Sequence, residues 1–288
     1  MRVSVIQMNP GHDKAANIAQ ARRLIEGAVA SDRPDMVVLP EVWSCLGGDS
    51  AAKFGQAEEL PAAGSGAPGG AAYEAMRGLA REKGIFVHGG SILERAGLER
   101  AGGEQAGGKL YNTTIAFDPE GRELARYRKI HLFDIVTPDG MGYRESATFG
   151  YGEQIVTYQA GELKIGCAIC YDIRFPELFL ALRRQEVDVI CLPAAFTLQT
   201  GKDHWETLIR SRAIETQCWF AATGTWGRHI DADGGARFTY GHSLICDPWG
   251  HVVAKVSDGE GWASARIDTA LSERVRRDMP VLEHRRLV

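Results

Sequence analysis

The sequence predicts an α/β fold with four layers, an α-β-β-α sandwich built from two similar halves. Short apolar runs typical of buried strands alternate with amphipathic helical patterns along the 288 residues. The order of these patterns over about residues 1–135 returns over about residues 160–270. Two such halves can pack the bare faces of their sheets together, with the helices outside. We therefore expect one domain, residues 1–288, with an internal pseudo-two-fold axis and a C-terminal tail from about residue 271.

The first half opens with an alternating strand pattern at Arg2–Asn9, and Asp13 is a candidate N-cap for a helix that runs to Ala30. A buried strand at Asp35–Pro40 comes next. Ser44–Gly70 is rich in Gly, Ala and Pro, which favours a long surface loop and suits a lid. The remaining elements expected in this half are a helix at Ala71–Lys83 stopped by Gly84, a strand at Ile85–Leu93, a solvated turn region at Glu94–Lys109, and a hairpin at Tyr111–Tyr127 that turns at Asp118–Gly121.

The second half repeats this order, and the likeness extends to individual residues. Leu39-Pro-Glu41 corresponds to Leu192-Pro-Ala194, and Asp118-Pro-Glu-Gly121 corresponds to Asp247-Pro-Trp-Gly250. The elements expected in this half are a strand at Leu163–Cys170, a helix at Pro176–Arg184, a strand at Asp188–Leu192, a helix at Asp203–Thr216, a strand at Cys218–Thr223, and a hairpin at Tyr240–Lys255 that turns at Asp247–Gly250.

Three chemically capable residues have no partner in the repeat. Glu41 stands where the second half has Ala194, and Cys170 ends a strand whose first-half counterpart carries no cysteine. Lys129 follows the first hairpin, whereas residues 256–261 after the second hairpin offer nothing comparable. Because a structural residue would more often recur in both halves, this asymmetry marks all three as functional candidates.

These side chains suit attack on a carbonyl. A cysteine attacks as its thiolate, a carboxylate can remove the thiol proton, and an ammonium can stabilise the oxyanion that forms. Cys170 is expected where a buried strand gives way to a turn before Pro176, a position at which a sheet holds a catalytic residue rigidly. The alternative is structural: Cys170 as a small core residue, Glu41 as a helix-start carboxylate, and Lys129 as one charge of a basic run.

Composition excludes several classes of function. The net charge of −4 leaves no basic footprint for nucleic acid, and no run approaches the ~18 apolar residues that a membrane span needs. The apolar run at the N-terminus is too short for a signal peptide, so we expect a cytoplasmic protein. In that compartment the six cysteines stay reduced, and the eight histidines show no zinc-site spacing, so we expect no metal.

Three segments carry a family resemblance. Leu39-Pro-Glu41, Tyr127-Arg-Lys-Ile-His-Leu132 and Gly166-Cys-Ala-Ile-Cys-Tyr-Asp-Ile-Arg-Phe-Pro-Glu177 resemble, in order, the signature segments of the nitrilase superfamily of carbon–nitrogen hydrolases. The resemblance covers nearly the whole chain. It implies the four-layer sandwich, no cofactor, and a catalytic triad of Glu41, Lys129 and Cys170. It also implies an auxiliary glutamate, at Glu145, that helps to position the lysine and the substrate.

The sequence around the cysteine is similar to the Nit branch, which holds omega-amidases and deaminated-glutathione amidases. The branch implies hydrolysis of a small acidic amide, such as deaminated glutathione or an α-keto-ω-amide like α-ketoglutaramate, through a cysteine thioester. An N-carbamoyl-amine hydrolase or a nitrilase of the same superfamily is the alternative, although true nitrilases usually have Cys-Trp-Glu where this chain has Cys-Tyr-Asp. Residues 46–70 and 137–152 depart from the branch, and both segments could shape the pocket.

Further site residues are expected around the triad. The backbone N–H of Tyr171 is a candidate oxyanion donor beside Lys129. Arg174 is a candidate anchor for a substrate carboxylate, because a guanidinium binds a carboxylate in a fork, with a structural ion pair as the alternative. Trp43, Phe196 and Thr197 are candidate wall residues of the pocket.

Two other expectations concern redox chemistry and assembly. Cys167 and Cys170 have the Cys-x-x-Cys spacing of thiol–disulfide oxidoreductases. In those proteins the first cysteine opens a helix, whereas Cys167 is expected inside a strand, which disfavours this alternative. The family resemblance also implies a homodimer or a higher homo-oligomer, formed through Phe175–Leu182 and Asp203–Arg210 with residues 282–288 crossing over.

Overall fold

The computed structural model describes residues 1–95, 108–137, 140, 142–230 and 234–287. The first sheet has the strand order β17-β1-β2-β3-β5-β4, with β6 pairing on β5. Its strands are β1 (Arg2–Gln7), β2 (Met36–Val38), β3 (Phe86–His88), β4 (Ile92–Arg95), β5 (Leu110–Phe117), β6 (Glu123–Arg128) and β17 (Gly261–Arg266).

The second sheet has the order β16-β15-β12-β11-β10-β9. Its central strands β10, β11 and β12 are parallel, as β1, β2 and β3 are in the first sheet. Its strands are β9 (Thr157–Ala160), β10 (Leu163–Cys167), β11 (Val189–Ala194), β12 (Trp219–Gly224), β15 (Leu244–Cys246) and β16 (Val252–Lys255).

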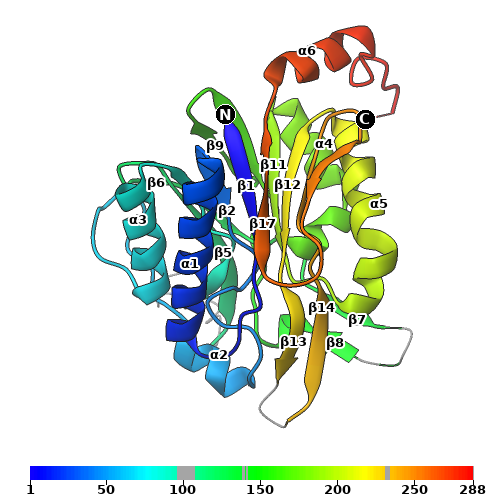
Figure 1. Ribbon diagram of the computed structural model, residues 1–288. Helices are drawn as coiled ribbons and strands as arrows, with labels where there is room; N and C mark the ends of the chain where they lie inside the picture. Colours follow the sequence, from blue (N-terminus) through cyan, green and yellow to red (C-terminus); the bar gives the residue numbers. More distant parts are fainter. Residues whose placement is uncertain (96–107, 138–139, 141, 231–233, 288) are drawn as a thin grey trace.

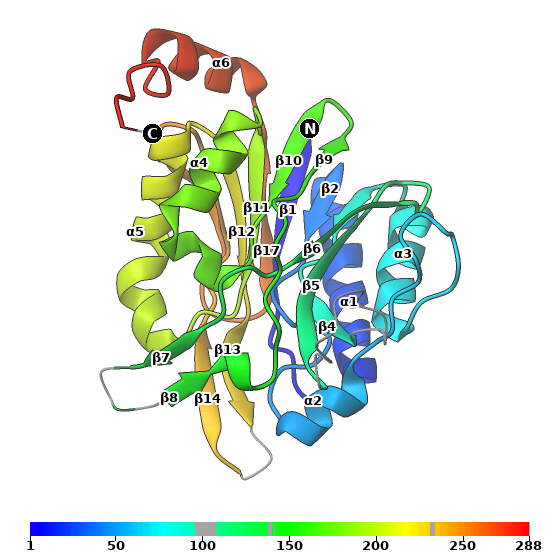
Figure 2. The same cartoon turned by 180° about the vertical axis from the view of Figure 1, so that it is seen from behind.

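The two sheets face each other between two layers of helices (Figures 1 and 2). Helices α1 (Lys14–Asp32) and α3 (Ala71–Lys83) cover the first sheet, and α4 (Pro176–Arg184) and α5 (Leu198–Thr216) cover the second. Buried apolar residues that the two sheets turn toward each other belong to one cluster, including Val5 and Val38 from the first sheet and Ile165 and Cys191 from the second. The predicted α-β-β-α sandwich is confirmed.

Capping and turn residues in the sequence correctly predict where several helices and hairpins begin or end. The Asp13 carboxylate accepts hydrogen bonds from the N–H groups of Ala15 and Ala16 at the start of α1. Gly84 ends α3 with φ of 64°, a conformation that glycine adopts without steric cost. Both hairpin turns close as expected, with Gly121 N–H donating to the Asp118 carbonyl at 2.9 Å and Gly250 N–H donating to the Asp247 carbonyl at 3.0 Å.

Other boundaries differ from the sequence prediction. The strand expected at Ile85–Leu93 is two strands, β3 and β4, because Gly90 turns the chain with φ of 59°. The loop expected at Ser44–Gly70 contains α2 (Ser50–Gln56), whose N-cap is Asp49. Helix α5 begins at Leu198, five residues before the predicted start.

The prediction of a solvated turn region at Glu94–Lys109 is wrong at its first residue. Glu94 lies buried in β4, where its carboxylate binds Arg128 and accepts a hydrogen bond from the Thr113 hydroxyl. Residues 96–107 of that prediction lie outside the described residues.

The chain ends in elements that no sequence pattern predicts. Strand β17 lies in the region assigned to the second half, yet it pairs antiparallel with β1 in the first sheet. Helix α6 (Thr269–Asp278) follows it. The two halves are therefore joined by β17, which the second half contributes to the first sheet, as well as by the packing of their sheets.

Two small hairpins extend the carboxyl end of the parallel strands. They are β7 (Asp134–Val136) with β8 (Gly142–Arg144), and β13 (Trp226–Ile230) with β14 (Ala236–Tyr240). Figure 2 shows both hairpins at the same end of the sandwich as α2, with the two chain termini at the opposite end. None of the described helices is long and apolar enough to cross a membrane.

Candidate active site

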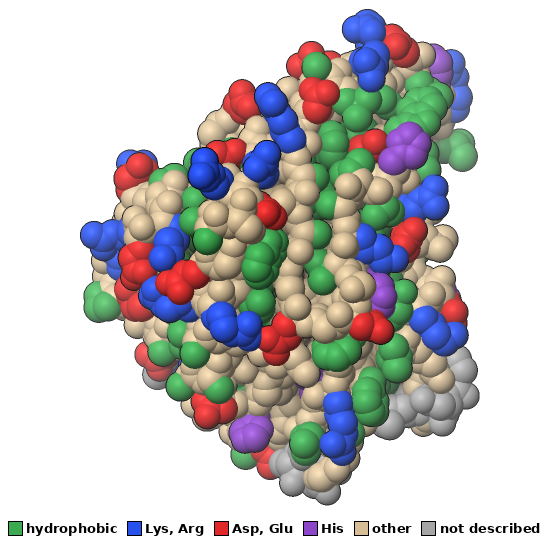
Figure 3. All heavy atoms as spheres, viewed as in Figure 1, with side chains coloured by type: hydrophobic (Ala, Val, Ile, Leu, Met, Phe, Trp, Pro, Cys, Tyr) green, Lys and Arg blue, Asp and Glu red, His purple; other side chains and the backbone are tan. Residues whose placement is uncertain are grey.

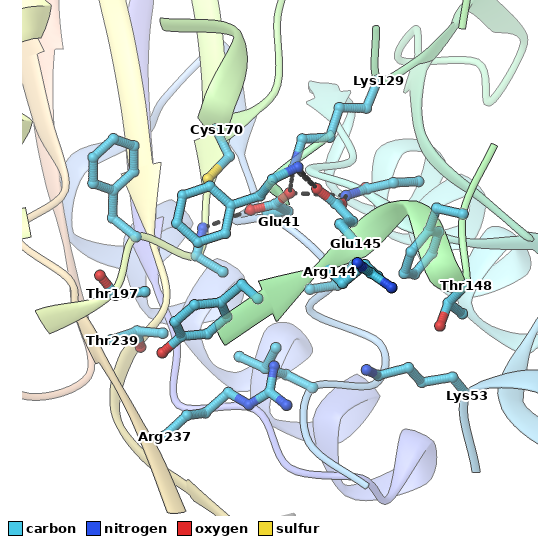
Figure 4. Close-up of a pocket in the computed structure, with 18 of the residues that line it drawn as sticks. Glu41, Lys53, Lys129, Arg144, Glu145, Thr148, Cys170, Thr197, Arg237 and Thr239 are labelled. Carbon is cyan, nitrogen blue, oxygen red and sulfur yellow. Dashed lines mark hydrogen bonds and ion pairs between the residues drawn. The ribbon is translucent and has the colours of Figure 1, made fainter. Parts of the chain in front are cut away.

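Segments from both sheets meet at the carboxyl end of the parallel strands. Glu41 comes shortly after β2, and Lys129 follows directly after β6. Cys170 comes after β10 and opens the 3₁₀ helix η2 (Cys170–Arg174). Figure 4 shows these three side chains pointing toward one another. The structure therefore brings together the three residues that the sequence repeat leaves unpaired.

Glu41 is held by donors on three separate segments. Its Oε1 accepts hydrogen bonds from Lys129 Nζ at 2.9 Å and from Asn112 Nδ2 at 2.8 Å. Its Oε2 accepts from the Ala195 N–H at 2.8 Å. Because only 4% of this residue is exposed, the carboxylate has little water to compete with these donors. Its position is therefore fixed by both sheets.

Lys129 lies between two carboxylates. Its Nζ donates to Glu41, and it contacts both oxygens of Glu145 at 3.1 and 2.8 Å. Glu145 opens the short 3₁₀ helix η1 (Glu145–Ala147), and its Oε2 also accepts from the Phe133 N–H at 2.6 Å. Burial lowers the pKa of Lys129, but the charges of Glu145 and Glu41 outweigh burial and hold that pKa well above its ordinary value. The site thus contains an ammonium that stays charged at neutral pH.

Cys170 has an unusual backbone and a protonated thiol. Its φ of 46° lies in the left-handed region that non-glycine residues rarely adopt, and the residue is only 7% exposed. Burial raises the pKa of Cys170 well above its ordinary value, and the neighbouring Glu41 charge raises it further, while Lys129 and the Ala195 N–H act in the opposite direction. At neutral pH the resting group is a thiol, so attack on a carbonyl requires a base. Glu41 is the carboxylate in place to serve as that base.

Asp172 connects the turn that carries the nucleophile to the end of β6. Its fully buried carboxylate accepts hydrogen bonds from the Ile169 N–H at 2.8 Å and the Tyr127 hydroxyl at 2.7 Å. It also accepts from the His131 N–H at 3.0 Å and lies 2.7 Å from His131 Nδ1. One carboxylate therefore holds together the chain on either side of Lys129 and the chain that leads into Cys170.

Replacing Asp172 with asparagine should destabilise the fold and slow the reaction. The amide nitrogen cannot accept a hydrogen bond, so at least one buried donor loses its partner, at a cost of about 1–3 kcal/mol. Urea unfolding should show this loss, and kcat should fall by more than the change in folded fraction explains. Asp118→Asn is the matched control, because Asp118 also accepts from backbone N–H groups but lies at a distant hairpin turn. Equal kcat values for the two variants would refute the positioning role of Asp172.

The triad opens into a cavity of about 260 Å³. Phe196 and Thr197, expected in its wall, both line it. The two segments expected to shape the pocket, residues 46–70 and 137–152, also contribute to the lining. From these segments come Leu46, Lys53, Gly142, Tyr143, Arg144, Glu145, Thr148 and Phe149.

Three other residues expected in the site lie outside this lining, namely Trp43, Tyr171 and Arg174. Trp43 is buried in the core between the first sheet and its helices, where its Nε1 donates to the Gly89 carbonyl at 2.8 Å. Arg174 lies behind Phe196, with its guanidinium carbon 5.6 Å from the ring centroid and its Nη2 3.3 Å from His204 Nδ1. Trp43 is therefore a core residue, and among the described residues Arg174 neither lines this cavity nor forms an ion pair with a carboxylate.

The geometry adds residues that sequence reasoning missed. Asn112 donates to Glu41 and lies 3.4 Å from Glu145 Oε1, and Ala195 supplies a backbone donor to Glu41. Asn112, like Glu41, Lys129 and Cys170, has no counterpart in the internal repeat, because the corresponding position of the second half is Gly241. The backbone N–H of Ala195 could not be recognised from the sequence, because every residue except proline has such a donor.

The environment of Cys167 disfavours thiol–disulfide chemistry. This cysteine ends β10, is fully buried, and has its thiol pKa raised by burial to about 12. Redox-active cysteines require the opposite, an exposed thiol of lowered pKa. Within the described part of the chain, no group of three or more His, Cys, Asp or Glu residues is arranged to hold a metal ion.

Comparison with known proteins agrees with this geometry. The model of the carbon–nitrogen hydrolase family matches residues 2–277. The chain is 37% identical to a deaminated glutathione amidase of Synechocystis over 98% of this chain and 97% of that protein. It is 35% identical to the omega-amidase NIT2 of Danio rerio, over 99% and 94% of the two chains. The solved structure of Saccharomyces cerevisiae Nit3, a member of branch 10 of the nitrilase superfamily, is 29% identical over 100% of this chain and 97% of that one, with a TM-score of 0.83. The chain belongs to the carbon–nitrogen hydrolase family.

Proposed function

We propose that this enzyme is a cofactor-independent amidase that cleaves the amide of a small acidic substrate through a thioester on Cys170. The observation that carries the proposal is that Glu41, which binds the Lys129 ammonium, and Cys170 lie in the wall of one cavity with their side chains pointing toward one another (Figure 4). This arrangement provides a nucleophile, a base and a fixed positive charge within a single small site.

In the acylation step, Glu41 takes the thiol proton while the sulfur bonds to the amide carbon. The negative charge passes to the carbonyl oxygen, where Lys129 and the Tyr171 N–H stabilise it. Tyr171 lies in the first turn of η2, where backbone N–H groups lack intrahelical partners. The carbon–nitrogen bond then breaks, Glu41 returns the proton to the leaving nitrogen, and ammonia or an amine departs.

In the deacylation step, Glu41 takes a proton from water as the water oxygen attacks the thioester carbon. Collapse of the second tetrahedral intermediate breaks the carbon–sulfur bond, and the proton returns to the Cys170 sulfur. Glu145 keeps the ammonium in place throughout, because it binds Lys129 independently of the proton carried by Glu41.

The proposed substrates are deaminated glutathione and short α-keto-ω-amides. The named activities of the Synechocystis and Danio rerio relatives support both. A release assay for ammonia and amines should therefore favour deaminated glutathione or α-ketoglutaramate over N-carbamoyl amines and simple nitriles. Preference for a carbamoyl compound or a nitrile would overturn this substrate class and leave only the triad chemistry.

We further propose a homodimer formed around α4 and α5. Apolar side chains remain exposed beside this layer, including Ile214 at 51% and Trp249 at 51%, and Figure 3 shows hydrophobic side chains gathering on this side of the molecule. Light scattering at micromolar concentration should give twice the 31.4 kDa mass of the chain. A monomeric mass would refute the proposal.

We also propose that the protein is cytoplasmic and that residues 1–288 form a single domain. All six cysteines are free, which suits the reducing cytoplasm. The exchange of β17 into the first sheet and the core shared between the sheets support one domain over residues 1–288.

A further inference from the structure

We propose that Asn112 is a positioning residue that reserves Oε2 of Glu41 for the proton of Cys170. Asn112 lies in β5, is buried, and lines the same cavity as the triad. Its side chain and its backbone each bind a different member of the site. This inference rests on the proposed amidase function and assigns one further residue to it.

The orientation of the Asn112 amide follows from its neighbours. Its Nδ2 donates to Glu41 Oε1 at 2.8 Å and lies 3.4 Å from Glu145 Oε1. Because an amide oxygen would be repelled by both carboxylates, the nitrogen is the atom that faces them. The buried Oδ1 of Asn112 has no donor within the described part of the chain. The hydrogen bonds that this side chain makes there are therefore those to the two carboxylates.

The backbone of Asn112 anchors the lysine of the site. Its carbonyl accepts a hydrogen bond from the Lys129 N–H at 2.9 Å, at the point where the chain leaves β6. One residue of β5 thus holds Lys129 through its main chain and Glu41 through its side chain. A side-chain substitution at Asn112 removes the second of these contacts and keeps the donor and acceptor of the first.

The two oxygens of Glu41 differ in how many donors they meet. A carboxylate oxygen has two lone-pair sites, and those of Oε1 are taken by Lys129 Nζ at 2.9 Å and Asn112 Nδ2 at 2.8 Å. Oε2 accepts from the Ala195 N–H at 2.8 Å. Among the described hydrogen bonds this leaves Oε2 with one site for a further donor.

Oε2 is also the oxygen beside the sulfur. Burial and the Glu41 charge raise the pKa of Cys170, whereas Lys129 and a hydrogen bond from the Ala195 N–H act against that rise. The Ala195 N–H therefore lies next to both the sulfur and Oε2. Figure 4 shows the side chains of Cys170 and Glu41 pointing toward one another.

This arrangement gives each proton transfer a defined atom. As the sulfur bonds to the amide carbon, the S–H bond breaks, an O–H bond forms at Oε2, and the π electrons of the carbonyl move to its oxygen. When the carbon–nitrogen bond breaks, its electron pair goes to nitrogen, which takes the proton from Oε2. Without Asn112, a lone pair of Oε1 becomes available on the Lys129 side, away from the sulfur.

The first test measures how the Cys170 proton is shared, and it does not require amidase activity. Asn112→Ala and Asn112→Leu both remove the donor, and the leucine keeps the side-chain volume, which controls for easier access of a reagent. A carboxylate that has lost a donor holds a proton more strongly, so a larger fraction of Cys170 should be thiolate. Peptide mass spectrometry should show iodoacetamide alkylating Cys170 about tenfold faster near neutral pH in both variants, the effect of one charge-assisted hydrogen bond.

The alkylation rate reports on Glu41 because the other ionisable groups keep their partners. The groups whose charges act on one another here are Glu41, Lys129, Glu145 and Cys170. Neither substitution removes the ion pairs of Lys129 with the two glutamates. Unchanged or slower alkylation in both variants, with a fold verified by circular dichroism, would overturn the positioning role.

Thr113→Val is the matched control. Thr113 is the next residue of β5, is fully buried, and donates from its hydroxyl to the buried Glu94 carboxylate at 2.6 Å. Neither Thr113 nor Glu94 belongs to the described lining of the cavity. The control should therefore lose stability while its rate of Cys170 alkylation and its kcat stay at the wild-type values.

The second test is amide turnover. Both Asn112 variants should lower kcat about ten- to a hundredfold, the usual cost of a misplaced catalytic group. KM should change little, because Asn112 acts through Glu41. A residue that bound the substrate through Oδ1 would instead raise KM and leave the alkylation rate unchanged, and that result would overturn the proposal.

The two tests separate the role of Asn112 from the proposed function. If the wild-type protein cleaved no amide but alkylation of Cys170 rose in both variants, the amidase proposal would fail while the positioning role stood. If the wild type cleaved amides and both variants matched it in alkylation and turnover, the positioning role alone would be wrong.

Discussion

Replacing Cys170 with alanine should lower kcat by at least about 10⁴-fold, because removal of a nucleophile from a working triad leaves only binding and oxyanion stabilisation. The variant should still fold, since the loss of one sulfur atom at a cavity wall creates little new void. The measurement is ammonia or amine release at saturating substrate, with circular dichroism to verify folding.

Cys167→Ala is the matched control for this result. It removes the same atom three residues earlier, from a fully buried position in β10. Its kcat should stay within a fewfold of wild type, although its stability should fall by about 1 kcal/mol for the lost packing. Retained activity in Cys170→Ala, or loss of activity in Cys167→Ala with an intact fold, would reassign the nucleophile.

The second large effect is expected from Glu41→Gln, which should lower kcat by about 10²- to 10⁴-fold, the usual contribution of a general base. The amide keeps the shape of the side chain but cannot take a proton from sulfur or from water. Glu58→Gln is the control, because Glu58 is equally buried and also binds a lysine, Lys14, but lies outside the cavity lining.

The same variant should change the titration of Cys170 in a direction that separates a base from a structural residue. The Glu41 charge raises the pKa of Cys170, so its removal should lower that pKa. At a fixed pH near neutrality a larger fraction of the thiol is then ionised. The pH profile of iodoacetamide alkylation should therefore move to lower pH while amide turnover falls.

Glu41 would lose its proposed role if this profile did not move, or if turnover survived. A collapse of both turnover and alkylation would instead indicate that the substitution disrupts the site.

Much of the fold could be predicted because local chemistry fixes it. Pro176 begins α4 and Gly84 ends α3, since each residue has a backbone restriction or freedom that suits one place in a helix. The alternating strands and the repeated turns at Asp118 and Asp247 then reveal two similar halves. Strand β17 was not predicted, because it pairs with β1 at the other end of the sequence and no local pattern reveals that pairing.

The meeting of Glu41, Lys129 and Cys170 could be predicted from sequence because these residues stand at element ends and break the internal repeat. The wall of the cavity could not. Trp43 lies only two residues after Glu41, yet the turn that follows β2 directs its ring into the core behind the sheet. Arg174 lies four residues after Cys170, but η2 carries it behind Phe196.

Lys53 and Arg237 show why the cavity could not be predicted in detail. They come from segments more than 180 residues apart, and neither belongs to a recognisable motif. Only the packing of α2 and β14 beside the ends of the two sheets brings them together. Charges that converge in this way become visible when the tertiary arrangement is known.

The central claim is that an acyl group passes through the Cys170 sulfur. The most direct measurement is rapid acid quench during the first turnover of an anilide substrate, whose good leaving group makes acylation outpace deacylation, followed by peptide mass spectrometry. We predict that the peptide containing Cys170 gains the mass of the acyl group and loses it on treatment with hydroxylamine. An anilide turned over with no acyl mass on any peptide, or with that mass on another residue, would contradict the claim.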